Sequence, residues 1–479
     1  MVASDDYSRD GHAEASVIGT SIDELDVGHL DDETQRFVLE THLENIGFMD
    51  FIGFELASLS SQYSNYSSLP TVPSGSSGAR GGMGNVSAFV TIMKSFIGMG
   101  ILTLPYATAK GGWILGPLAL IFVAGLSHHC MGLLVKLGGS ATTKTVSFGR
   151  LAAQICGPST KILVDVCIIV TQFGFAIAEL IFIVQNVRDV VCLETQGEAC
   201  PSKGVMCTGA LLLLLPFAYL KSLQVLTVPV LMSNVVLLCG IAYIYFCFVG
   251  QIGAHGTASG IVAFNWAELP VFFGCAVFSF EGIGLILPIH AAMQDASHFP
   301  PLLRKAMMIL AALFSSFGLC GYAAYGPEVR DMITFSIPQN KITSFLRLFY
   351  CLGIFFTYPV MMFPLFGVTE GKSRWLRDSR HWWRSAVWRS VLVGLTGIIG
   401  MQIPHFGLFL GLIGSVACSA LAFVLPAVLH LKRIDRSDAT RRGDVKDVAI
   451  IAFGSTAGMI SFIMTLRELI VAMQSDSAE

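Results

Sequence analysis

The stretch GMGILTLP, residues 98–105, interrupts a long apolar segment, and a related stretch, GIGLILP, follows at residues 282–288. Each combines two glycines with a proline, the residue types that most often end or kink a helix. An unwound backbone inside a bilayer leaves N–H and C=O groups without partners, at a cost of several kcal/mol per group. Such a break persists only where it lines a protein cavity, so the two breaks predict a binding site near the middle of a membrane.

The composition sets the class of protein. Of 479 residues, 53% are hydrophobic and only 13% are charged, which is too apolar for a hydrated surface and indicates a polytopic membrane protein. The net charge of -3 argues against a nucleic-acid partner. The sequence has no phosphate-binding loop, no zinc-like spacing of Cys and His, and no cluster of nucleophile and base. We therefore expect no metal site, no cofactor and no enzymatic activity.

Three regions differ in composition. Residues 1–84 are acidic and then rich in Ser and Gly, which predicts a disordered cytosolic tail without a signal peptide. Within it, residues 37–54 have the apolar spacing of an amphipathic helix that could dock elsewhere. Residues 85–473 form the predicted transmembrane domain, and residues 474–479 form a short C-terminal tail.

About eleven membrane spans are expected from segments of roughly 20 apolar residues. Most cations fall in the loops that share a side with the N-terminus, so the positive-inside rule predicts a cytosolic N-terminus. The expected spans are 86–109, 112–136, 161–187, 205–220, 224–250, 268–291, 302–325, 342–368, 385–402, 406–431 and 446–472.

Most of the twelve cysteines lie inside apolar spans, where a thiol behaves as a small hydrophobic group. Cys192 and Cys200 instead flank a polar loop on the non-cytosolic side, where a disulfide can form and persist. Cys207 is a competing partner.

Several blocks of the sequence resemble the amino acid/auxin permease family, and within it the proton-coupled amino acid transporters and the fungal vacuolar amino acid transporters. The run FSFEGIGLILP is the most specific of them. The blocks are KSFIGMGILTLPYA at 94–107, DVCIIVTQFGF at 165–175, FSFEGIGLILP at 278–288, Gly321-Tyr322 with Tyr325-Gly326, and GIFFTYP at 353–359.

The resemblance implies an all-α fold of the LeuT type, in which spans one to five and six to ten form inverted repeats and an eleventh helix follows. The two breaks then belong to the first and sixth helices. The implied function is secondary active transport of small neutral amino acids by alternating access, coupled to protons. Sodium coupling and an amino acid sensor that signals through the N-terminal tail are the alternatives.

The breaks suggest how a zwitterion would bind. Backbone N–H groups after the first break suit a carboxylate, and carbonyls at the second break suit an ammonium group. The same glycines could instead serve only close helix packing. The expected substrate-binding residues are Gly98, Gly100, Ile101, Ser279, Phe280, Gly282, Gln172 and Tyr358.

Two acidic residues lie deep inside expected spans, where a charged carboxylate costs about 2.5 to 3.5 kcal/mol on translocon scales. Glu281 adjoins the second break, and Glu179 lies in the third span at a position where the related transporters carry an aromatic residue. Both are candidates for proton coupling. Glu281 could instead only cap free backbone groups, and Glu179 could instead reflect a change in specificity.

The membrane is not specified by a targeting motif. The acidic tail without a signal peptide favours a vacuolar or lysosomal membrane, and the plasma membrane is the alternative. The expected partners are a small amino acid, the lipid bilayer and a cytosolic regulator of the N-terminal tail, and any oligomeric state is compatible with the sequence.

Overall fold

The computed structural model describes residues 83–476 except for 141–146, 199, 221–225, 373–375, 377–381, 404 and 434–440. The predicted tail at residues 1–84 lies outside the described residues except for Met83 and Gly84. Residues 477–479 of the C-terminal tail lie outside them as well.

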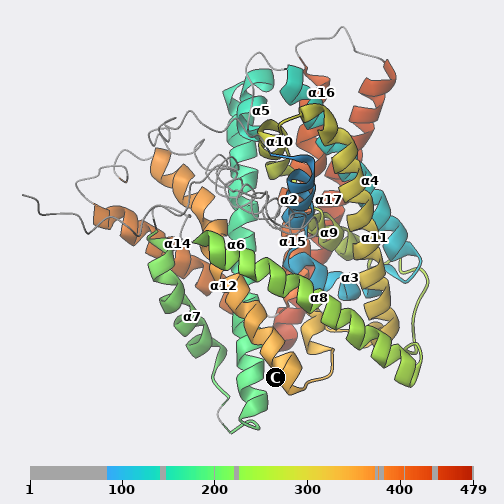
Figure 1. The fold of residues 1–479 in the computed structure, drawn as a ribbon, viewed down its shortest axis with the longest axis vertical. Helices are drawn as coiled ribbons and strands as arrows, with labels where there is room; N and C mark the ends of the chain where they lie inside the picture. Colours follow the sequence, from blue (N-terminus) through green and yellow to red (C-terminus); the bar gives the residue numbers. More distant parts are fainter. Residues whose placement is uncertain are drawn as a thin grey trace, which may run out of the picture. The chain divides into compact units, whose positions relative to one another are not determined.

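Helices make up nearly all of the described chain (Figure 1). The first half contains α2 (Asn85–Phe96), η2 (Met99–Thr103), α3 (Leu104–Gly111), α4 (Leu115–Ser140), α5 (Phe148–Cys156), α6 (Pro158–Glu194), α7 (Lys203–Ala218) and α8 (Thr227–His255). The second half contains α9 (Leu269–Ser279), α10 (Ile283–Ala292), η4 (Ala296–His298), α11 (Phe299–Tyr325), η5 (Gly326–Glu328), η6 (Ile333–Phe335), α12 (Lys341–Lys372), α14 (Trp382–Gln402), α15 (Phe406–Ile413), η8 (Gly414–Cys418), η9 (Ala420–Val424), α16 (Leu425–Leu431) and α17 (Arg441–Asp476).

Eight helical segments within the described ranges are long and apolar enough to cross a membrane, and the bent pair α2 and η2–α3 makes a ninth. The other two expected spans are also helical but fall short of that standard. The helix α7 has only 16 residues. In α14, Arg384 and Arg389 near the start shorten the apolar stretch.

The first break follows the glycines as expected. The helix α2 ends at Phe96, and the chain resumes as a short 3-10 helix at Met99, with a bend of 45° between the two parts. Pro105 then lies in the first turn of α3, where its missing N–H group removes no helical hydrogen bond.

The second break is shorter. The helix α9 ends at Ser279 and α10 begins at Ile283, so Phe280, Glu281 and Gly282 form the interruption. Pro288 lies inside α10 and does not end it. Of the spans, Leu269–Ala292 is the most enclosed by protein, whereas Met232–His255 and Gly443–Gln474 are the most exposed to the surroundings.

The two broken helices touch at their glycines. A Cβ atom added to Gly100 would lie 3.2 Å from the ring of Phe278 and 3.3 Å from Oγ of Ser279. A Cβ atom added to Gly282 would lie 2.7 Å from the ring of Phe96. Each glycine therefore allows its own helix to approach the end of the other half-helix.

A backbone bridge joins the chain just before α2 to the chain just after α10. The N–H group of Met83 donates to the carbonyl of Ala292 at 2.9 Å, and the N–H group of Gln294 donates to the carbonyl of Met83 at 3.1 Å. The beginning of the first broken helix and the end of the second therefore lie on one side of the membrane domain, which we call the N-terminal side. At the far end of α6, Cys192 and Cys200 are joined by a disulfide.

Candidate functional site

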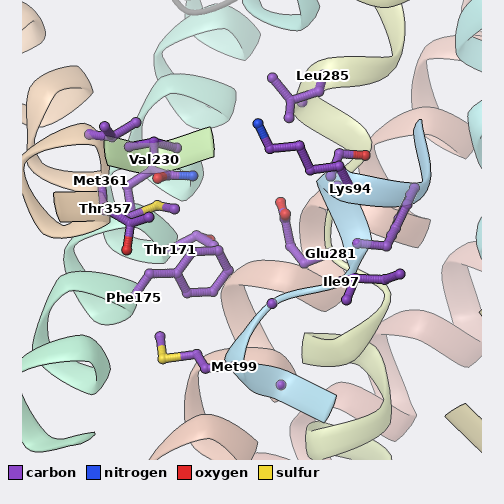
Figure 2. A pocket seen from close by; sticks show the side chains of 18 of the residues that line it. Lys94, Ile97, Met99, Thr171, Phe175, Val230, Glu281, Leu285, Thr357 and Met361 are labelled. Carbon is purple, nitrogen blue, oxygen red and sulfur yellow. The ribbon is translucent and has the colours of Figure 1, made fainter. Parts of the chain in front are cut away.

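A cavity of about 310 Å³ lies between the two helix breaks and the helices α6, α8 and α12. Figure 2 shows two facing walls. Lys94, Ile97 and Glu281 lie on the wall formed by the broken helices, and Thr171, Phe175 and Thr357 lie on the opposite wall.

The cavity extends from the breaks toward the N-terminal side. Its lining comes from α2 before the first break, from α10 after the second break, from the first part of α8, and from the middle of α12 between Tyr350 and Met361. Ser147 and Phe148 at the beginning of α5 also line it. Because successive spans alternate in direction, the lining parts of α2, α10 and α8 lie in the same half of the membrane domain.

Packed elements close the opposite side. The helix α3 packs on η5, and η2 packs on η6, so the connection between α11 and α12 covers the first broken helix. Oδ2 of Asp331 in this connection accepts a hydrogen bond from the N–H group of Gly407 at 3.2 Å. Lys110 at the end of α3 binds both Glu268 at 2.8 Å and Glu468 at 3.4 Å. Among the described residues, these contacts close the side of the cavity opposite the N-terminal side.

The structure brings most of the expected site residues together around this cavity. Those that line it are Gly98, Gly100, Gln172, Glu179, Ser279, Glu281 and Gly282. They come from α6 and from both breaks, whose glycines Gly98 and Gly282 are 184 positions apart in the sequence.

Three expected residues lie away from the cavity. Ile101 is buried in the hydrophobic core, on a part of η2 that faces the protein. The ring of Phe280 lies 5.2 Å from the ring of Phe314 on α11. The hydroxyl of Tyr358 lies 2.7 Å from Oγ1 of Thr396 on α14. In each case the neighbouring position along the helix lines the cavity instead.

The glycines of the first break have different surroundings. A Cβ atom added to Gly98 would meet no atom within 4 Å, so the backbone at this position is open to the cavity. Gly100 lies against Phe278 and Ser279, as helix packing requires. Gly98 therefore leaves the backbone accessible to a ligand, whereas Gly100 serves close packing between the two broken helices.

At the second break, Ser279 is buried and donates its hydroxyl to the carbonyl of Cys275 at 2.9 Å. The N–H group of Glu281 donates to the carbonyl of Phe278 at 3.1 Å. The side chain of Glu281 lies on the cavity wall below Lys94 (Figure 2). A carboxyl group thus meets the cavity where the helix is interrupted.

Glu179 lies on the opposite wall and is only 4% exposed. Its Oε1 atom lies 2.7 Å from the hydroxyl of Thr357 on α12. Its Oε2 atom has no hydrogen-bond partner among the described residues. The same Thr357 hydroxyl lies 2.9 Å from the carbonyl of Ile354.

Sequence reasoning did not assign several lining residues to the site. Lys94 and Thr357 belong to two of the sequence blocks quoted above, but the residues that they face in the fold could not be predicted. Ser233 and Asn234 on α8 were missed, although two adjacent polar residues in an apolar span were a usable signal. Met99 and Phe175 line the cavity without any distinguishing signal, because apolar residues are common at every depth.

Within the described ranges, no group of three or more His, Cys, Asp or Glu residues could hold a metal ion. The polar groups of the cavity are backbone, hydroxyl, amide, carboxyl and ammonium groups. Such a set can bind a small polar molecule and exchange protons with it.

Residues 81–467 match the sequence profile of the family described as transmembrane amino acid transporter protein. The chain is 31% identical to amino acid transporter AVT3B of Arabidopsis thaliana over 397 residues, which cover 80% of this chain and 92% of that protein. It is 33% identical to amino acid transporter AVT3C of Arabidopsis thaliana, covering 72% of this chain and 81% of that protein. It is 30% identical to vacuolar amino acid transporter 3 of Saccharomyces cerevisiae, covering 77% of this chain and 54% of that protein.

Among solved structures, the chain is similar to MhsT, which was solved in complex with L-phenylalanine. The TM-score is 0.50 at 13% identity, and the similarity covers 79% of this chain and 98% of that structure. At this identity the similarity concerns the fold alone. It confirms the expected LeuT-like arrangement, with inverted repeats that each begin with a broken helix.

Proposed function

Because this chain belongs to the transmembrane amino acid transporter family, we propose that it carries amino acids, small neutral ones among them, across a membrane. A proton gradient drives this transport. The observation that carries the proposal is the cavity that both helix breaks line, since it places unwound backbone and two carboxyl groups around one space. The family consists of transporters, which confirms the expectation that the chain is not an enzyme.

The broken helices offer both kinds of group that a zwitterion needs. The open backbone at Gly98 gives a substrate carboxylate access to N–H groups, and no side chain stands between them. At the second break, the backbone near Ser279 and Glu281 can accept hydrogen bonds from an ammonium group. The substrate backbone would therefore bind on the wall formed by the two breaks.

Glu281 is the proposed carrier of the driving proton. It lies at an interruption of the most enclosed span and lines the cavity. A carboxylate at this depth must be neutralised by a proton or a cation, so uptake and release of a proton can accompany the opening of the cavity to one side and then the other. Because its backbone is not helical, a small change at the break can alter its exposure.

We also propose that the N-terminal side faces the cytosol and that the protein resides in a vacuolar membrane. The charge distribution of the loops supports the orientation, and relatives named as vacuolar transporters support the membrane. The cavity then faces the cytosol in this structure. Protons that leave an acidic lumen would drive amino acids from the lumen to the cytosol.

Purified full-length protein in proteoliposomes tests the proposal. Uptake of a panel of radiolabelled amino acids is measured under an imposed pH gradient, an imposed sodium gradient, or neither. We expect accumulation only with the pH gradient, dissipated by a protonophore. Accumulation that requires sodium would replace the proton by sodium as the driving ion, and binding without any accumulation would reject transport.

The variant Glu281→Gln tests the role of the carboxyl group. It should abolish uptake driven by the pH gradient while retaining exchange of labelled for unlabelled substrate, because exchange needs no net proton movement. Glu194→Gln, the same change at an exposed residue at the end of α6, is the matched control and should behave as wild type. Undiminished proton-driven uptake by Glu281→Gln would contradict the assignment.

One observation supports a sensor as a second candidate function. The bridge between Met83 and the end of α10 connects the N-terminal region directly to two helices that line the cavity. A change at the cavity could thus reach a cytosolic regulator through that region. Deletion of residues 1–82 should abolish signalling with normal amino acid flux if the protein is a sensor, whereas a change in flux alone would favour a transporter.

A further inference from the structure

The two walls of the cavity differ in chemistry. The wall that contains Ile97 and Glu281 includes the interrupted backbone, and the wall that contains Thr171 and Thr357 consists of intact helices (Figure 2). A substrate whose amino and carboxyl groups bind at the breaks would therefore direct its side chain toward α6, α8 and α12. The residues of this second wall would decide which side chains are accepted.

Glu179 is the charged group of the second wall. It is nine-tenths buried or more, being 4% exposed, and it lines the cavity. Oε1 is engaged by the hydroxyl of Thr357, while Oε2 has no hydrogen-bond partner in the part of the chain that the structure describes. Buried polar atoms are nearly always paired, so an oxygen left without a partner at a cavity wall indicates a group that the ligand supplies.

Among the residues that the structure describes, the lining of the second wall presents no cation to Glu179. From α12, the polar groups that line the cavity are Tyr350 and Thr357, and from α8 they are Ser233 and Asn234. Lys94, the one basic residue among the described lining residues, lies on the wall of the broken helices together with Glu281 (Figure 2). A buried carboxylate without a neighbouring cation is costly, so Glu179 requires either a proton or an incoming positive charge.

The hydroxyl of Thr357 can form a hydrogen bond with Glu179 whether Glu179 is protonated or ionised. It has one proton but lies 2.7 Å from Oε1 of Glu179 and 2.9 Å from the carbonyl of Ile354. When Glu179 is protonated, its O–H group can donate to Thr357, and Thr357 donates to Ile354. When Glu179 is ionised, Thr357 donates to the carboxylate instead. The two states differ by one proton and by the direction of this hydrogen bond.

We propose that Glu179 forms a side-chain subsite that binds the terminal cation of a basic amino acid, and that this cation and a proton compete for the carboxyl group. With the proton in place the second wall is neutral and accepts a neutral side chain. When a basic side chain enters, the proton leaves Glu179 for the water of the open cavity, and an ion pair forms with the substrate. The inference rests on the proposed function, which it extends to a class of substrates.

Lysine and norleucine provide a direct test with the wild-type protein. Norleucine has the same four-carbon side chain without the ammonium group. Binding to the purified full-length protein is measured by titration calorimetry at pH 7 in two buffers of different ionisation enthalpy. We expect lysine to bind about tenfold more tightly than norleucine, a difference of about 1.4 kcal/mol that a hydrogen-bonded charge pair can supply. We also expect about one proton to be released per lysine and none per norleucine.

The variant Glu179→Gln should remove both the preference for lysine and the release of the proton, and binding of alanine should remain. Glu194→Gln lies on the same helix, is exposed, and should keep both properties. The proposal is overturned if wild-type protein does not prefer lysine, or if Glu179→Gln retains the preference. The wild-type comparison decides the question even if Glu179→Gln fails to fold.

These binding measurements, together with the proteoliposome uptake described above, separate this proposal from the proposed function. If alanine and norleucine bind and are driven by the pH gradient but lysine has no advantage, the subsite is wrong and the transporter assignment stands. If none of the three amino acids binds, the proposed function fails, and with it the premise of the subsite.

Discussion

Gly282 lies against the ring of Phe96, so close that a Cβ atom at Gly282 would be 2.7 Å from Cε1 of that ring. Phe96 is the last residue of α2, and Gly282 precedes the first residue of α10. The contact therefore joins the last turn before one break to the first turn after the other. Together with Gly100 against Phe278, it defines how the two broken helices cross.

This relationship separates two glycines that look alike in the sequence. Gly282→Ala should displace the Phe96 ring and lower the stability of the purified protein by about 1 to 3 kcal/mol. Gly98→Ala should fold normally, since its Cβ atom would enter open space, but should weaken amino acid binding because the methyl group occupies the cavity. Thermal unfolding and binding of alanine measure both effects. Equal loss of stability in the two variants would contradict the packing described here.

A second prediction concerns Arg347 on α12, which is fully buried. Its Nε donates to Oδ1 of Asn186 at 3.0 Å, its Nη1 donates to Oε1 of Gln339 at 2.7 Å, and its Nη2 forms an ion pair with Asp189 at 2.6 Å. Asn186→Leu removes one of these acceptors from a buried charge and should cost about 2 to 4 kcal/mol. An unfolding temperature within 1 °C or so of wild type would show that the charge is solvated in another way.

A third prediction tests Tyr358, which the sequence placed in the binding site. Its hydroxyl instead contacts Thr396, and the Thr396 hydroxyl also lies 2.7 Å from the carbonyl of Val393. Tyr358→Phe should lower stability by about 0.5 to 1.5 kcal/mol and leave the affinity for amino acids unchanged. Reduced affinity for amino acids with unchanged stability would show that Tyr358 contributes to substrate binding.

The fourth prediction concerns the disulfide between Cys192 and Cys200, which are separated by 8 positions in the sequence. Closing a loop of this size removes conformational freedom from the unfolded chain and is worth about 2 to 3 kcal/mol. A reductant should therefore lower the unfolding temperature of wild-type protein and leave a Cys192→Ser, Cys200→Ser double variant unaffected. If both respond equally, the reductant acts on other cysteines.

The same disulfide also tests the proposed orientation of the protein in the membrane. In sealed vesicles isolated with the cytosolic face outward, a membrane-impermeant reductant should leave the disulfide intact until detergent is added. Labelling of Cys192 and Cys200 by a thiol reagent then measures the reduced fraction. Reduction without detergent would place the end of α6 in the cytosol and reverse the proposed direction of transport.

Features that depend on a few neighbouring residues, such as helix breaks and polar loops, were predictable from the sequence. Glycines around Gly98 and Gly282 ended helices where expected, and Cys192 and Cys200 were recognised from a short polar loop. The exceptions are local too. Pro288 is accommodated inside α10, and Arg384 and Arg389 leave α14 with a shorter apolar stretch than a typical span.

The candidate site was predictable only in part. Glu179 and Glu281 stood out because charge is costly in a membrane, and both line the cavity. Phe280 was expected beside them, but its ring packs against Phe314. Adjacent side chains at a helix break are directed to different sides. Nothing in the sequence relates Thr357 to Glu179, which is 178 positions away.

The sequence by itself determined that the chain is a bundle of membrane helices with two interruptions, because hydrophobicity and backbone preference act over neighbouring residues. Only the tertiary structure decided which side chains meet, on which side the cavity opens, and which glycine is packed and which is free. Those features depend on how each helix is rotated and where it crosses another. Close contacts such as Gly282 with Phe96 set that rotation, and no local pattern encodes it.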